Sequence, residues 1–123
     1  MPELPEVQTV VNSIKQKLPG KIIQSIKCPN GYTGVFENGS FLTYNNFLIG
    51  QTLQSIYRRG KFIIIELNAG FLLIHLRMTG KVILDKPTLN NMKYTSFHLK
   101  FSDGSNLFFQ DIRKFGRIYI CKN

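Results

Sequence analysis

KFIIIEL, at residues 61–67, is the clearest structural signal in the chain. Three consecutive isoleucines follow Phe62 at its centre, and Glu66 is the one polar residue between them and Leu67. β-Branched side chains favour extended backbone, and a continuous apolar run of this length is typical of a strand that is covered on both faces. The turn signals Arg59-Gly60 and Asn68-Ala69-Gly70 bound it. The run therefore predicts a central strand in a layered β structure.

Similar short β-rich runs lie on both sides of it, divided by further turn signals such as Asn30-Gly31 and Ser102-Asp103-Gly104. They occupy residues 21–28, 36–44, 51–59, 71–78, 81–85, 94–101, 106–110 and 117–121. Residues 86–93 are predicted to form one longer loop.

Apolar residues at helical spacing predict one amphipathic helix over residues 5–18, with Pro5 in its first turn and Pro19-Gly20 after its end. The fold class expected is mainly β with one N-terminal α-helix. About eight strands form an antiparallel β-sandwich or a flattened barrel, as a single domain over residues 1–123.

Composition narrows the functional classes. The 123 residues are 43% hydrophobic and 19% charged, a globular balance. No apolar window is long enough for a transmembrane helix and no secretory signal is recognisable, so an intracellular protein without membrane contact is expected. Cys28 and Cys121 are too few for a disulfide scaffold or a four-ligand zinc site, and reduced thiols are expected.

Charge is distributed unevenly along the chain. Residues 1–50 hold four basic and three acidic residues, a net charge of +1, whereas residues 51–123 hold twelve and four, a net charge of +8. Such a surface suits a polyanion such as nucleic acid. A solvated basic surface without a partner is the alternative.

The N-terminus has the residues for amine chemistry. Removal of Met1 would leave Pro2 with a free secondary amine, and an α-amino group titrates near pH ~8, so part of it is nucleophilic at neutral pH. Attack on a sugar C1′ would give an iminium ion, and Glu3 could protonate the ring oxygen. Glu6 could hold the amine. Alternatively, both glutamates only stabilise the helix start.

Three more motifs carry candidate DNA contacts. RRGK places Arg58, Arg59 and Lys61 around a glycine turn that could face phosphates. HLRMTG contains His75, a candidate phosphate donor, and Met78, a candidate apolar wedge. A basic hairpin tip, a satisfied histidine and a core methionine are the alternative interpretations.

In DIRKFGR, Arg113 and Phe115 alternate across Lys114, so in an extended loop they would point the same way. A guanidinium and a ring projecting together could hydrogen-bond an orphaned base and stack on its neighbour. A polar hairpin is the alternative.

The ordered series MPELPEV, RRGKF, HLRMTG and DIRKFG resembles the N-terminal domain of formamidopyrimidine-DNA glycosylase, a base-excision repair family, over essentially the whole chain. The resemblance implies Pro2 as nucleophile, Glu3 as general acid, Glu6 near the amine and Lys61 beside the lesion, where it assists proton transfer. It further implies that His75 contacts a phosphate and that three side chains fill the gap left by an everted nucleotide: Met78, Arg113 and Phe115.

The resemblance also implies a function. It indicates a glycosylase/AP lyase that removes oxidised purines such as 8-oxoguanine and formamidopyrimidines and cleaves by β,δ-elimination. The expected partner is double-stranded DNA containing such lesions or abasic sites, bound by a monomer. No metal or other cofactor is expected in this chain, because the family's helix–two-turn–helix and zinc-finger domains are absent from it.

Some positions depart from the family pattern. Ile112 and Lys114 replace proline and arginine, and Tyr94 stands where the family has a DNA-contacting histidine. Two other functions remain open: a non-catalytic or lyase-only DNA-binding remnant, and a basic β-sandwich that binds another polyanion, RNA included.

Overall fold

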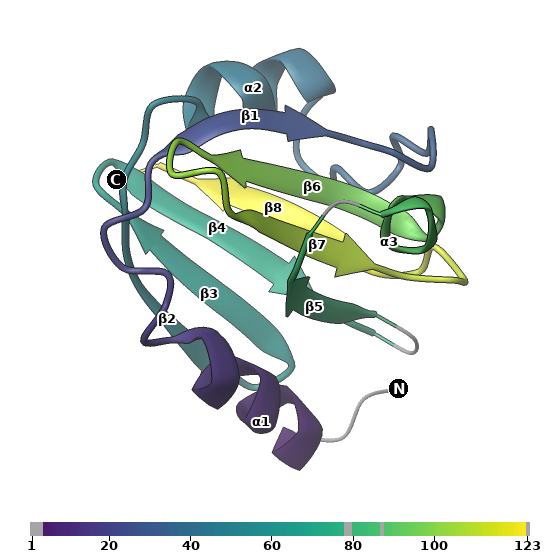
Figure 1. Ribbon diagram of the computed structural model, residues 1–123, viewed down its shortest axis with the longest axis horizontal. Coiled ribbons are helices and arrows are strands. Elements are labelled where there is room, and N and C mark those ends of the chain that lie inside the picture. The colour runs from purple at the N-terminus through teal and green to yellow at the C-terminus, as the bar shows by residue number, and fades with distance from the viewer. Residues whose placement is uncertain (1–3, 78–79, 87, 123) are drawn as a thin grey trace.

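A computed structural model describes residues 4–77, 80–86 and 88–122. It forms two four-stranded antiparallel sheets packed face to face, the β-sandwich that the sequence predicts (Figure 1). One sheet has the order β1-β6-β7-β5 and the other β2-β3-β4-β8. The first sheet contains β1 (Ile23–Lys27), β6 (Thr95–Phe101), β7 (Asn106–Gln110) and β5 (Lys81–Leu84). The second contains β2 (Leu53–Arg59), β3 (Phe62–Leu67), β4 (Gly70–His75) and β8 (Arg117–Cys121).

β3 is the KFIIIEL run, and it has a neighbour on each side, as predicted. It pairs with β2 and β4 in registers that place Ile64 opposite both Tyr57 and Leu73. Ile63, Ile64 and Ile65 are all buried, so both faces of the strand are covered at its centre.

The core lies between the sheets and is rich in aromatic side chains. Phe97, Phe101 and Phe109 are fully buried in it. Burying each such ring stabilises the fold by about 1.5–3 kcal/mol relative to an exposed position.

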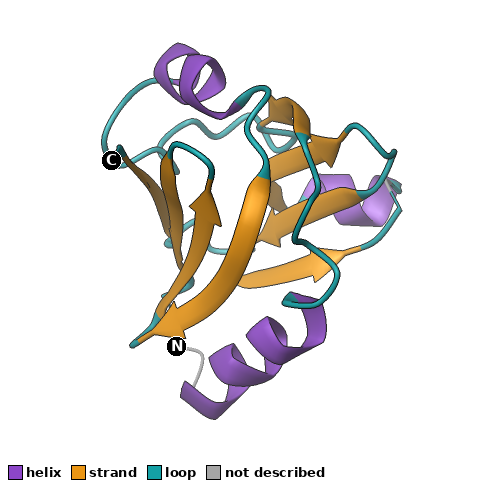
Figure 2. Ribbon diagram, turned by 90° about the vertical axis from the view of Figure 1, so that its left-hand side faces the viewer, coloured by secondary structure: helices purple, strands orange, loops and turns teal. Residues whose placement is uncertain are grey.

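α1 (Leu4–Ile14) packs against β2 and β5, which are edge strands of different sheets. The helix thus lies across one open side of the sandwich, at the bottom of Figure 2. Val11 and Ile14 reach the core, one helical turn apart. The predicted helix is confirmed, but it ends at Ile14, and Leu18 enters the core from the turns that follow.

One predicted strand is wrong. The run at residues 36–44 contains a turn and the start of α2 (Phe41–Leu48), which lies at the top of Figure 2. Ser40 caps this helix by accepting a hydrogen bond from the Thr43 N–H at 3.3 Å. Tyr44 and Leu48, four residues apart, form its buried face.

The predicted long loop at residues 86–93 also contains a short helix, α3 (Leu89–Lys93). The Met92 N–H closes its first turn on the Thr88 carbonyl at 2.9 Å. Among the described residues, no helix combines the length and apolar character needed to cross a bilayer.

Candidate nucleic-acid interface

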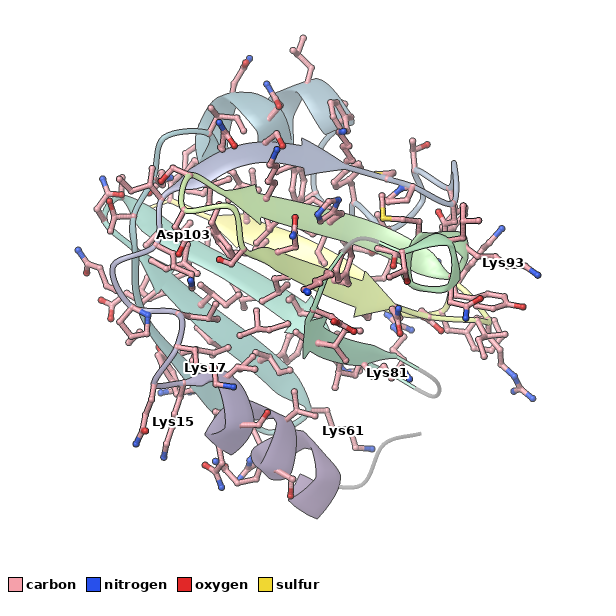
Figure 3. All side chains as sticks on the ribbon, viewed as in Figure 1. Lys15, Lys17, Lys61, Lys81, Lys93 and Asp103 are labelled. Atoms are coloured by element: carbon pink, nitrogen blue, oxygen red, sulfur yellow. The ribbon has the colours of Figure 1, made fainter. Side chains whose placement is uncertain are left out.

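Three of the predicted motifs meet at one end of the β2-β3-β4-β8 sheet. The strand register pairs Phe62 at the start of β3 with His75 at the end of β4, and His75 with Arg117 at the start of β8. The β2–β3 turn, the residues after β4 and the loop before β8 therefore belong to the same end of the sheet. In Figure 1 the β2–β3 turn lies at the bottom beside α1, and the loop before β8 lies at the right. In Figure 3, Lys61, Lys81 and Lys93 lie in the right half of the view, whereas Lys15 and Lys17 lie in the left half.

His75 is half-buried at the centre of this end. Its ring meets the Phe62 ring edge to face, with centroids 4.6 Å apart. Its Nδ1 is buried and has no hydrogen-bond partner within the described part of the chain. Burial first, and then the positive charges of Arg77 and Lys61, lower the pKa of His75. A phosphate beside this ring would oppose the effect of the two cations and favour the protonated imidazole.

The two arginines of RRGK have different surroundings. Arg58 turns toward α1, where its Nε donates to the Gln8 Oε1 at 2.9 Å, and its Nη1 donates to the Gly60 carbonyl at 3.2 Å. Arg59 is exposed and lines a hollow of about 250 Å³ on the outer face of the sheet, beside Tyr57 and Ile64. The structure therefore does not gather the cations of this motif around one phosphate position. Lys61 is the cation of this motif whose charge lowers the pKa of His75, and it belongs to the interface.

Residues 111–116 form a tight loop instead of the extended segment predicted. Asp111, only 2% exposed, accepts hydrogen bonds from the N–H groups of Arg113 at 3.2 Å and Gly116 at 2.5 Å. Lys114 has a left-handed backbone, with φ of 59°.

The loop nevertheless brings the two predicted side chains together. The Arg113 guanidinium lies 6.0 Å from the centre of the Phe115 ring, which is 44% exposed. Lys114 turns to Tyr32, with its Nζ 5.6 Å from that ring. The proximity of Arg113 and Phe115 was predictable, but its cause is the turn and not strand alternation.

Sequence reasoning missed three residues of this interface: Tyr32, Asp111 and Arg117. Arg117 donates from Nη1 to the carbonyls of Lys114 and Gly116, at 2.8 Å each, and its guanidinium lies 5.7 Å from the Tyr32 ring. The one available signal was an acidic residue placed before a glycine-containing turn.

Tyr94 borders the same end. It is 42% exposed, and the Lys93 Nζ lies 5.2 Å from its ring. With Lys81 and Ile112 it lines a hollow of about 360 Å³ beside Asp111. A cationic and aromatic rim of this kind suits phosphates and bases.

The N-terminal catalytic prediction falls largely outside the described residues. Pro2, Glu3 and Met78 are not described, and Glu6 is placed only as a backbone position in the first turn of α1. Their roles stay predictions. Within the described residues, no group of three or more His, Cys, Asp or Glu side chains could hold a metal ion.

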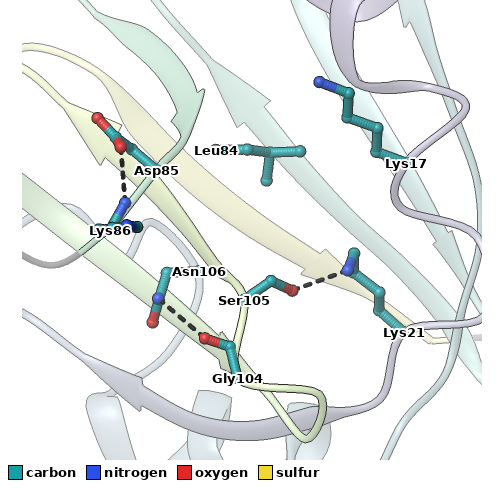
Figure 4. Close-up of a pocket in the computed structure, with 8 residues that line it drawn as sticks. All are labelled: Lys17, Lys21, Leu84, Asp85, Lys86, Gly104, Ser105 and Asn106. Carbon is teal, nitrogen blue, oxygen red and sulfur yellow. Dashed lines mark hydrogen bonds between the residues drawn. The ribbon is translucent and has the colours of Figure 1, made fainter.

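A hollow of about 530 Å³ lies at the other end of β7, around Asn106 (Figure 4). The Nζ of Lys21 is engaged there by Asp103 at 2.5 Å and by the Ser105 hydroxyl at 2.8 Å. The hydrogen bond from Lys21 is the main reason that the pKa of Asp103 lies well below its usual range. These bonds tie the chain after α1 to the β6–β7 turn, away from the interface.

Comparisons with known proteins agree with the motifs. Residues 1–118 match the model of the formamidopyrimidine-DNA glycosylase N-terminal domain. The chain belongs to this family. The formamidopyrimidine-DNA glycosylase of Exiguobacterium sp. is 38% identical over 125 residues, a match that covers 100% of this chain and 44% of that protein.

Two solved structures of the Lactococcus lactis glycosylase have the same fold. One is non-covalently bound to DNA containing an AP site and the other is in complex with DNA containing FAPY-dG; each superposes with a TM-score of 0.87 at 34% identity. The matches cover 98% of this chain and 45% or 44% of those chains. The chain thus spans less than half the length of the relatives that it matches.

Proposed function

We propose that this chain provides the catalytic N-terminal domain of a base-excision repair glycosylase/AP lyase that acts on oxidised purines in double-stranded DNA. The observation that carries the proposal is the match of residues 1–118 to the family, with every motif in order. Support comes from the end of the sheet where Lys61, His75, Arg113 and Phe115 gather.

In the proposed reaction, the Pro2 nitrogen attacks C1′ of the damaged nucleotide. The C1′–N9 bond breaks, the base leaves with a proton, and Glu3 protonates the ring oxygen as the sugar opens. The iminium ion then accepts the electron pair released when a C2′ proton is removed, and the C3′–O bond breaks with loss of the 3′ phosphate. Removal of a C4′ proton then supplies the electron pair that breaks the C5′–O bond and releases the 5′ phosphate, and water hydrolyses the remaining imine to return the Pro2 amine. Glu6 is proposed to hold the amine and Lys61 to assist proton transfer beside the lesion.

Binding is proposed to combine phosphate contacts with filling of the gap in the duplex. His75 and the cations around it would face phosphates, and Met78, Arg113 and Phe115 would occupy the space of the everted nucleotide. Eversion costs a few kcal/mol, which these contacts would offset.

Borohydride trapping on an oligonucleotide with a preformed abasic site tests the proposal, because only a reactive amine forms a reducible imine. We expect a covalent product that Pro2→Gly greatly reduces and a blocked N-terminus abolishes. Full trapping by a chain that keeps Met1 would contradict the role of Pro2. DNA binding without any trapping would favour the non-catalytic remnant.

A preformed abasic site is the appropriate substrate for this chain. The residues proposed for imine formation lie within it. On this substrate, trapping reports imine formation without requiring excision of a base.

A further inference from the structure

The loop of residues 111–116 is held from both ends by charged side chains that take no part in the proposed chemistry. We propose that Asp111 and Arg117 are positioning residues, which brace this loop so that Arg113 and Phe115 are displayed together before DNA is bound. This inference rests on the proposed function for the use of the displayed side chains, but the brace itself can be tested without DNA.

Asp111 forms the first half of the brace. Its carboxylate is almost completely buried, and one oxygen accepts from the Gly116 N–H while the other accepts from the Arg113 N–H. A buried carboxylate is costly unless it is hydrogen-bonded, so the fold holds the loop backbone against it. The Lys114 N–H also approaches the Asp111 carbonyl, at 3.3 Å.

Arg117 forms the second half. One nitrogen of its guanidinium donates to the carbonyls of Lys114 and Gly116. The guanidinium is kept in place by Glu37, 3.5 Å from its Nε, and by the face of Tyr32. The carboxylate therefore satisfies N–H groups of the loop, and the guanidinium satisfies its carbonyls.

The backbone between the two halves needs this support. Lys114 is left-handed, a conformation that costs a residue with a side chain about 1–2 kcal/mol. Gly116 has no room for a Cβ, which would overlap the Phe109 ring and lie 3.0 Å from the Asp111 carboxylate. The loop is thus strained at Lys114 and tightly packed at Gly116, and the hydrogen bonds of Asp111 and Arg117 offset the strain.

The proposed function of the brace is to order residues 113–115 before DNA binds. Ordering each flexible residue costs about 1–2 kcal/mol, so three mobile residues at positions 113–115 would weaken DNA binding severely. With the brace, this cost is met when the chain folds. Phe115 and Arg113 then enter the gap in the duplex already side by side.

The chain contains no tryptophan, so Phe115→Trp creates a single fluorescent reporter at the tip of the loop. Time-resolved anisotropy of this tryptophan measures its local mobility in the free protein. We expect Asp111→Asn to lower the residual anisotropy clearly, because the amide cannot accept from both N–H groups as a carboxylate does. Arg117→Lys should lower it as well, since one ammonium group cannot keep both the two carbonyl bonds made by Nη1 and the ion pair that Nε makes with Glu37.

Asp103→Asn, an acidic position at the other end of the sandwich, is the matched control and should leave the anisotropy unchanged. An unchanged anisotropy in both Asp111→Asn and Arg117→Lys, with thermal unfolding showing folded variants, would overturn the brace. If Asp111→Asn does not fold, the result for Arg117→Lys decides alone.

Binding to DNA tests the consequence. We compare affinities for a duplex with a tetrahydrofuran abasic analogue and for the undamaged duplex, in a double-mutant cycle of Asp111→Asn with Arg113→Ala/Phe115→Ala. Asp111→Asn should reduce the preference for the abasic duplex by about tenfold, and have little further effect once Arg113 and Phe115 are truncated.

Additive effects would overturn the positioning role, since Asp111 would then act independently of the two displayed side chains. A wild-type chain with no preference for the abasic duplex would instead refute the proposed function. In that case the anisotropy alone would decide whether the brace exists.

Discussion

Gly116→Ala tests the packing beneath the interface most directly. The new methyl group would overlap the Cζ of Phe109 and lie 3.1 Å from the His75 carbonyl. Phe109 is fully buried, so neither the ring nor the β4 backbone can move aside without disturbing the core. Overpacking costs typically 1–3 kcal/mol, and contact on both sides puts this site in the upper part of that range. We expect a loss of about 2–3 kcal/mol, or about 10 °C in the melting temperature.

Thermal unfolding followed by circular dichroism measures the loss. Phe109→Leu removes the obstructing ring atoms, and in that background Gly116→Ala should cost at least about 1 kcal/mol less. Equal costs in both backgrounds would refute the reasoning, because the contact with Phe109 would then not be the cause.

Three further predictions concern charge and pH. The affinity of the chain for duplex DNA should rise on acidification toward the lowered pKa of His75, because a bound phosphate would raise that pKa and binding would take up a proton. His75→Phe should flatten this pH profile in fluorescence titrations. Lys61→Ala should reduce the slope of log affinity against log salt by about 0.9, whereas Lys17→Ala, on the other side of the molecule, should leave it unchanged. Burial lowers the pKa of His98, so the unfolded chain binds this proton more tightly than the folded chain. The free energy of unfolding should therefore be greatest above the ordinary histidine pKa and decrease as the pH falls below it. A free energy from urea unfolding that rises on acidification would contradict this prediction.

The strands could be predicted because their patterns are local. Eight of the nine β-rich runs contain strands, since β-branched and aromatic residues between turn signals leave few alternatives. The ninth failed at Ser40, where a helix cap follows directly on an Asn-Gly turn. Phe41 and Tyr44 are three residues apart, a spacing that suits a helix and not period-2 alternation, and the buried Tyr44 ring packs against Phe36.

The sequence predicts which residues belong to the candidate site, but it does not predict that they lie close together. The motifs identify Lys61, His75, Arg113 and Phe115, yet their proximity depends on the register that pairs Phe62 with His75 and His75 with Arg117. A shift of one residue in either pairing would turn the side chains of that strand to the opposite face.

Arg58 illustrates the same limit, because strand alternation turns it toward Gln8 of α1 and away from Arg59. The sequence gives the charge of a side chain, but the pairing of strands that are distant in the sequence decides which group the side chain contacts. The residues that hold the loop, Asp111 and Arg117, are ordinary surface types in the sequence. They acquire their positioning role only because β7 and β8 bring both ends of the same turn together, around the fully buried ring of Phe109.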